Sequence, residues 1–221
     1  QEESQAGEKR ACKLSFPDTD ALITDAKNVI LTSLHADCIP VWLYDPERHA
    51  AGLVHAGWRG TRADIAVKTA RKMCAEFGSA LEDLLAFIGP GISRCCFEVG
   101  AEVAEEFAAM LGTEVFYGEN GRYSIDDKNG KFHLDLKKIN ERLLQRAGLT
   151  KIAATNYCTC CSEDLFYSYR RDRGVTGRMC AGIMLLLSFL AQLVSRRADA
   201  AVSLAAAVLL MLLYNPFLAR N

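Results

Sequence analysis

The chain lacks a strong net charge of either sign. Its 221 residues carry 26 Lys and Arg against 27 Asp and Glu, which gives a formal net charge of -1 at pH 7. Proteins that bind nucleic acid or anionic membranes usually show a basic excess, and this balance gives no such global argument. We therefore expect no nucleic-acid partner.

The sequence also lacks a secretory signal and several common enzyme motifs. Its first ten residues are polar throughout, whereas a signal peptide needs an apolar segment. The nine cysteines are an odd number, and together these features favour a reducing cytoplasm over a disulfide framework. The patterns GxGxxG, GxxxxGK[ST] and GxSxG are missing, which argues against dinucleotide, nucleoside triphosphate and serine-hydrolase chemistry.

Strand and helix patterns alternate along one main domain, without internal repeats. Short apolar, β-branched or aromatic runs predict strands. They lie at residues 21–24, 28–34, 40–44, 51–56, 84–88, 151–155 and 166–169. Helical periodicity follows at residues 61–77, 101–111 and 136–144, with Gly78 and Gly148 as helix ends. This alternation predicts an α/β (α+β-like) domain of mixed β-sheet layers flanked by helices.

Composition divides the chain into three parts. Residues 1–18 are polar and aperiodic and are expected to form a loose N-terminal segment, residues 19–180 the domain, and residues 181–221 an appended hydrophobic helical tail. The tail holds two apolar segments around a basic turn. A bilayer-spanning helix needs about 20 apolar residues, so both segments are borderline. Membrane association through residues 181–214 and packing as buried or partner-covered helices both stay open.

The candidate chemistry lies in residues 35–60, where Cys38 and His55 fall at the ends of neighbouring predicted strands. A thiolate and an imidazole can share zinc or copper, or the imidazole can activate the thiol as a nucleophile. A buried cysteine beside a hydrogen-bonded core histidine would produce the same spacing. Spacing alone therefore leaves a metal site, a catalytic pair and a structural pair open.

Three further residues flank this pair. Asp37 is expected either to orient His55 through a carboxylate–imidazole bond or to cap the turn. His35 lies at odd spacing from Cys38, on the opposite face of an extended segment, and is expected to support the site without being a ligand. Arg59 follows Gly-Trp at a strand-to-helix junction, where its guanidinium can hold a phosphate or carboxylate; a surface salt bridge is the alternative.

Other clusters lie further along the chain. Arg170 and Arg171 belong to a polar cluster that follows a predicted strand, and they are candidates for substrate contacts. Cys95-Cys96 and the Cys-x-Cys-Cys run at residues 158–161 lack the paired CxxC…CxxC arrangement of a structural zinc site. We interpret them as buried thiols.

Five ordered motifs carry a resemblance to a known family. They are Ala36-Asp-Cys-Ile-Pro-Val, His55-Ala-Gly-Trp-Arg-Gly, Ile88-Gly-Pro-Gly-Ile with Cys95-Cys-Phe-Glu-Val-Gly, His133-Leu-Asp-Leu, and Phe166-Tyr-Ser-Tyr-Arg-Arg-Asp with Thr176-Gly-Arg-Met. In this order they resemble the laccase-domain family, whose members are named both multicopper polyphenol oxidase and purine nucleoside phosphorylase. The resemblance covers roughly residues 17–180.

The resemblance implies a sandwich-like mixed α/β fold and a pocket metal held by a His-Cys-His set. The metal is usually zinc, with copper as the alternative, and Cys38 and His55 match two of the ligands. The implied activity is phosphorolysis of adenosine, inosine and guanosine, with adenosine deamination as a side activity; the older family name implies copper-dependent phenol oxidation. Phosphorolysis needs cationic groups and preorganised donors, for which Arg59 is a candidate, whereas deamination needs a metal-activated water.

The sequence departs from the family pattern at both ends. The upstream His ligand would fall at Gln1 or Glu2, so we expect one ligand to be lost and the activity to be impaired. After a junction near residues 180–182, the chain resembles over a short stretch the membrane region of competence-type DNA-uptake channels. A third hypothesis is therefore an inactive, membrane-tethered domain. The oligomeric state stays open.

Overall fold

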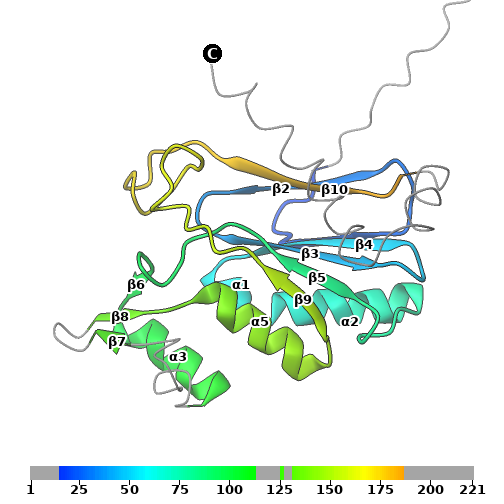
Figure 1. The fold of residues 1–221 in the computed structure, drawn as a ribbon, viewed down its shortest axis with the longest axis horizontal. Helices are drawn as coiled ribbons and strands as arrows, with labels where there is room; N and C mark the ends of the chain where they lie inside the picture. Colours follow the sequence, from blue (N-terminus) through cyan, green and yellow to red (C-terminus); the bar gives the residue numbers. More distant parts are fainter. Residues whose placement is uncertain (1–14, 113–124, 127–130, 187–221) are drawn as a thin grey trace, which may run out of the picture.

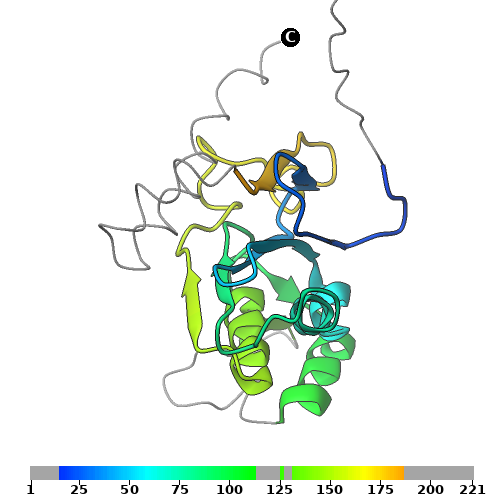
Figure 2. The same ribbon diagram turned by 90° about the vertical axis from the view of Figure 1, so that its right-hand side faces the viewer.

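The computed structural model describes residues 15–112, 125–126 and 131–186. Figure 1 shows three layers: a strand pair at the top, a five-stranded sheet in the middle and helices below. Figure 2, turned by 90°, shows the same sheet between the strand pair and the helices. This mixed arrangement of sheets and helices confirms the fold class expected from the sequence.

The central sheet has the strand order β1-β4-β3-β5-β9. All neighbours are antiparallel except β5 and β9, which are parallel. The strands β3 and β4 are almost wholly buried because both faces of the sheet are covered, which explains their nearly continuous apolar sequence. The bounds are β1 Ala21–Thr24, β3 Ile39–Asp45, β4 Ala50–Ala56, β5 Leu85–Ile88 and β9 Lys151–Ala154.

Helices cover one face of this sheet. They are α1 (Trp58–Arg62), α2 (Ile65–Phe77) and α5 (Leu136–Ala147), whereas α3 (Ala101–Leu111) packs beside α1. The main core lies between sheet and helices, and it includes the fully buried Val54, Met73 and Leu144. As the sequence predicts, α2 and α5 end at glycines, Gly78 and Gly148, whose left-handed backbone lets the chain turn away.

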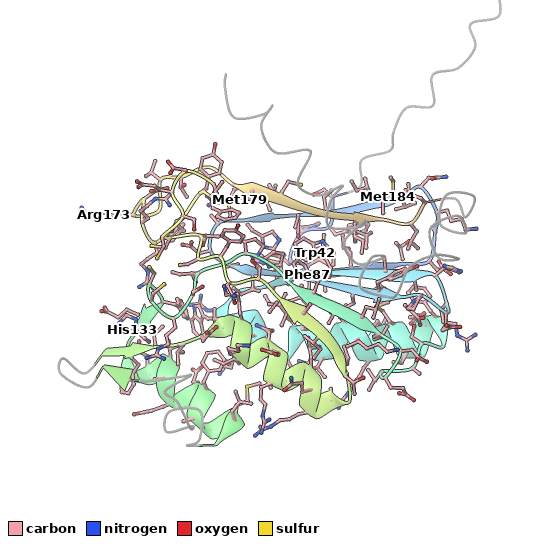
Figure 3. All side chains as sticks on the ribbon, viewed as in Figure 1. Trp42, Phe87, His133, Arg173, Met179 and Met184 are labelled. Carbon is pink, nitrogen blue, oxygen red and sulfur yellow. The ribbon has the colours of Figure 1, made fainter. Side chains whose placement is uncertain are left out.

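The strand pair β2 (Ile30–His35) and β10 (Met179–Met184) covers the other face. A small core of Leu31, Trp42, Leu53 and Ala181 lies between the two layers. The indole Nε1 of Trp42 donates a hydrogen bond of 3.0 Å to the carbonyl of Gly182, and the Trp42 ring lies 5.5 Å from that of Phe87 (Figure 3). The first residues of the apolar run that we assigned to a helical tail therefore form a strand, because here they pair with β2.

Three further strands form a small sheet of order β6-β8-β7, with β6 at Glu98–Val99, β8 at Lys131–His133 and β7 at Ile125–Asp126. The strand expected at residues 166–169 is wrong: this segment has no strand partner among the described residues, and Phe166 donates its N–H to the carbonyl of Ser162.

The tail from residue 187 onward lies outside the described residues. Within the part that the structure describes, no helix has the length and apolar character that crossing a membrane requires.

Candidate functional site

Pairing of β3 with β4 brings the predicted cysteine and histidine together. Pro40 lies opposite His55 in the register, so Cys38 comes just before the paired residues of β3. A Cβ atom on Gly57, which follows β4, would lie only 3.0 Å from the Cys38 Sγ. Cys38 therefore sits against the end of β4, beside His55.

Strand alternation points a second histidine at the same place. In β2 the residues Leu31 and His35 are buried, whereas the residues between them lie further out. The ring centroids of His35 and His55 are 5.0 Å apart, in an edge-to-face arrangement. The expectation that His35 and Cys38 lie on opposite faces of an extended segment is wrong, because Asp37 turns the chain between them with a φ of 82°.

His55 is held by two side chains. Its Nδ1 lies 3.0 Å from a carboxylate oxygen of Asp20, the residue before β1, and its backbone N–H donates to the Asp20 carbonyl over 2.7 Å. A hydrogen bond with the Cys38 side chain is the main reason that the pKa of His55 rises to about 9; partial burial opposes the rise and Asp20 adds to it. The imidazole thus lies between a thiol and a carboxylate.

His35 has a different environment. Its Nε2 lies 2.7 Å from the Ser33 hydroxyl and its Nδ1 lies 3.2 Å from the Cys38 carbonyl. Burial, followed by the charge of nearby His55, lowers the pKa of His35 to about 4, although the bond to Cys38 opposes this shift. A neutral His35 with both nitrogens engaged supports the Cys38 backbone and packs against the His55 ring.

Asp37 does not orient His55, contrary to one of the two roles expected. Its carboxylate is buried and accepts hydrogen bonds from the Thr159 hydroxyl at 2.6 Å, the Ser168 hydroxyl at 3.0 Å and the Arg170 backbone N–H at 2.7 Å. Asp37 therefore ties residues 159–170 to the turn that precedes Cys38. The carboxylate beside His55 is that of Asp20.

The three predicted arginines lie in distinct settings. Arg59 is exposed at the start of α1, and its guanidinium stacks 4.2 Å over the ring of Trp58. The Arg170 guanidinium donates to the Glu98 carbonyl at 2.9 Å. Arg171 is the most occupied, because its guanidinium donates to the carboxylate of Asp172 and to three backbone carbonyls of the same loop. Among these three guanidinium groups, that of Arg59 has the fewest contacts within the described part of the chain.

Comparison with known proteins identifies the family of this chain. The family model described as multi-copper polyphenol oxidoreductase laccase matches residues 2–186. The chain belongs to this family. The resemblance drawn from the ordered motifs is thereby confirmed.

Several relatives of this laccase-type family are known as individual proteins. The chain is 35% identical over 168 residues to "Purine nucleoside phosphorylase YlmD" of Bacillus subtilis, covering 75% of this chain and 58% of the relative. It is 41% identical over 171 residues to "Purine nucleoside phosphorylase" of Deinococcus radiodurans, covering 77% and 62%. The crystal structure of YlmD from Geobacillus stearothermophilus superposes with a TM-score of 0.69 at 36% identity, covering 76% and 61%. The chain thus spans about three fifths of these relatives.

Two features of this structure were not predicted from the sequence. Asp20 is one of several acidic residues around residues 18–25, and only the pairing of β1 with β4 places it against His55. The interpretation of the remaining cysteines as buried thiols is wrong for Cys95 and Cys161, which are exposed. Folding gathers these two with Cys96 and Cys158, so that the two cysteine groups form one cluster.

Proposed function

We propose that the chain carries the Cys38–His55 centre of a metal-dependent purine nucleoside phosphorylase. The reaction would convert adenosine, inosine or guanosine and phosphate into the free base and ribose 1-phosphate. The observation that carries the proposal is the position of the Cys38 thiol at the end of β4, beside the His55 imidazole, whose Nδ1 lies 3.0 Å from a carboxylate oxygen of Asp20. The printed names of the curated relatives point to the same activity.

The donor set fits a borderline metal ion. Thiolate and imidazole are both common zinc ligands, and a carboxylate on the distant ring nitrogen is a frequent partner of a metal-binding histidine. Because Asp20 engages Nδ1, Nε2 of His55 is the nitrogen that would bind the metal together with the Cys38 sulfur. Bound zinc would supply a Lewis acid and, for the proposed side activity of adenosine deamination, an activated water.

Three arginines of the chain would bind the phosphate, contact the substrate and hold the neighbouring loop. In phosphorolysis a phosphate oxygen forms a bond to C1′ while the bond from C1′ to the purine nitrogen breaks, and the base leaves with the electron pair and takes up a proton. The exposed guanidinium of Arg59 would bind the phosphate dianion and hold it for this attack. Arg170, which lies over the Phe97 ring at 5.6 Å, would also contact the substrate. Arg171 would hold that loop through its backbone contacts.

Incubation of the full chain with inosine and phosphate tests this proposal, with hypoxanthine and ribose 1-phosphate as the measured products. We expect Cys38→Ala and His55→Ala to abolish turnover, and Arg59→Ala to raise the KM for phosphate more than it changes kcat. The control is His49→Asn, which removes an exposed imidazole from a left-handed turn residue and should leave turnover unchanged. Turnover that survives His55→Ala at the wild-type rate would refute the assignment.

A second candidate is copper-dependent phenol oxidation, which the description of the matching family model favours. The same thiolate and imidazole also suit copper, and oxidase chemistry requires a redox-active metal. Metal analysis of the purified chain, followed by a phenol-oxidation assay with added copper, separates the two. Zinc without copper, together with phosphorolysis, would exclude the oxidase.

Location and tethering are separate proposals. We propose a cytoplasmic location on the strength of the odd cysteine count. Since residues 181–184 belong to β10, membrane association through residues 181–214 would have to come from the later part of that range. Fractionation of cells that express the full chain tests this, because a tethered domain sediments with membranes and resists extraction by high salt.

A further inference from the structure

Four thiols outside the Cys38–His55 centre meet in space. The Sγ atoms of Cys95, Cys96, Cys158 and Cys161 all lie within 4.8 Å of one another. The Sγ of Cys161 is 3.4 Å from that of Cys95 and 3.3 Å from that of Cys96. A disulfide bond is only about 2.05 Å long, so these sulfurs are separate donor atoms gathered around one point.

Backbone contacts bring the two cysteine segments together. Gly91 and Cys158 form a parallel β-bridge, and the N–H of Thr159 donates to the Gly91 carbonyl over 3.2 Å. A turn follows, in which the N–H of Ser162 donates to the Cys158 carbonyl over 3.0 Å. This turn folds the Cys-x-x-Cys segment so that its first and last thiols face residues 95–96. Backbone contacts therefore bring the two cysteine segments together without a metal ion.

A backbone donor and a buried lysine lie beside the cluster. The Ser93 backbone N–H donates to the Cys158 sulfur over 3.3 Å. Lys137 is 5% exposed, and its ammonium donates to the carbonyl of Tyr157, next to Cys158, over 2.8 Å. Thiolates bound to a metal ion here would thus lie near a backbone N–H and a buried lysine.

We propose that Cys95, Cys96, Cys158 and Cys161 together bind one structural zinc ion. Tetrahedral zinc with sulfur at about 2.3 Å separates its ligands by about 3.8 Å, and the observed separations of 3.3 Å to at most 4.8 Å lie on either side of that value. Binding releases the four thiol protons and leaves a doubly negative centre, which Lys137 partly offsets. Four protein thiolates leave no open position for substrate, so the site is structural.

This ion would brace the turn beside the candidate active site. Thr159 follows the ligand Cys158 and donates its hydroxyl to the Asp37 carboxylate at 2.6 Å. Asp37 directly precedes Cys38. Zinc would therefore fix the segment that holds Asp37, and through it the position of the Cys38 sulfur. The zinc assignment itself does not depend on the phosphorylase proposal, because it stands on the four thiols alone.

Metal analysis of a variant without the other candidate centre tests the proposal. The full chain with Cys38→Ala and His55→Ala should still copurify with close to one zinc per chain after dialysis. Cobalt in its place should give the intense sulfur-to-metal charge-transfer absorption of a thiolate-rich tetrahedral site. Adding Cys158→Ser and Cys161→Ser should abolish both signals. Cys74→Ser and Cys180→Ser, which remove free thiols outside the cluster, should change neither.

A second measurement keeps all four cluster cysteines, because a serine variant can fail to fold. In the zinc-loaded chain, Cys95 and Cys161 should react with a thiol reagent far more slowly than Cys180, although all three are exposed. A strong chelator should restore their reactivity. A dialysed chain without zinc whose four cluster thiols react as fast as Cys180 would overturn the proposal. So would peptide mapping that finds Cys161 in a disulfide with Cys95 or Cys96.

Discussion

Replacing Asp37 tests how strongly the turn before Cys38 is held. The Asp37 carboxylate accepts three hydrogen bonds, from two side-chain hydroxyls and one backbone N–H. Both hydroxyls, those of Thr159 and Ser168, belong to residues with 0% exposure. Hydrogen bonds to charged groups contribute about 1.5–3 kcal/mol each, and a buried group left without a partner costs about 1–3 kcal/mol. The backbone of Asp37 is also left-handed, which costs of order 1 kcal/mol in an ordinary residue.

Contributions that share one carboxylate do not add in full, so we expect Asp37→Ala to lower the free energy of unfolding by about 3–6 kcal/mol, since it removes every acceptor and keeps the backbone strain. Asp37→Asn should cost about 1–3 kcal/mol, because asparagine tolerates the left-handed conformation and keeps one acceptor oxygen. The difference between the two variants separates the loss of charge from the loss of all partners.

Urea unfolding followed by circular dichroism measures both values, with the midpoint and the slope fitted together. The control is Asp25→Asn, an exposed carboxylate in the turn after β1, which should stay within about 0.5 kcal/mol of the wild type. If Asp37→Ala also stays within that margin, Asp37 does not tie residues 159–170 to the turn.

Three smaller changes probe the neighbouring contacts. Gly57→Ala places a Cβ 3.0 Å from the Cys38 sulfur at a residue with extended backbone, so we expect at least a tenfold loss of metal affinity at the Cys38–His55 centre with little loss of stability, measured by competition with a chelator. Asp20→Asn removes the carboxylate beside Nδ1 of His55 and should weaken metal binding there by about 10–100-fold, as such partners of metal ligands typically do. Trp42→Phe removes the indole bond between the layers and should cost about 1–3 kcal/mol in urea unfolding, since the Gly182 carbonyl loses its partner.

Each change has a result that would contradict its reasoning. Unchanged metal affinity in Gly57→Ala would mean that the Cys38 sulfur is not a ligand or moves aside freely. Unchanged affinity in Asp20→Asn would show that the His55 ring is oriented without Asp20. A wild-type unfolding midpoint for Trp42→Phe would show that the strand pair β2–β10 does not depend on the indole bond.

Local sequence patterns determined most of the elements. Short apolar runs located β1–β5 and β9, and the helical spacing located α2, α3 and α5, because these patterns depend only on which faces are buried. The end of the chain behaved differently, since residues 179–184 are apolar in a way that suits either a helix or a strand. These residues form a strand because they pair with β2.

The ordered motifs likewise determined the family. The proximity of Cys38 and His55 was also predictable, because both residues lie at the ends of strands that are consecutive in the sequence and pair in the sheet. Tertiary structure alone decided which carboxylate meets His55, since Asp20 and Asp37 are the same residue type and only their places in the fold distinguish them. It also decided the cysteine cluster: Cys96 and Cys161 are far apart in the chain, and a parallel bridge at Gly91 brings their sulfurs to 3.3 Å. Contacts of this kind follow from the path of the whole backbone, which a local pattern does not encode.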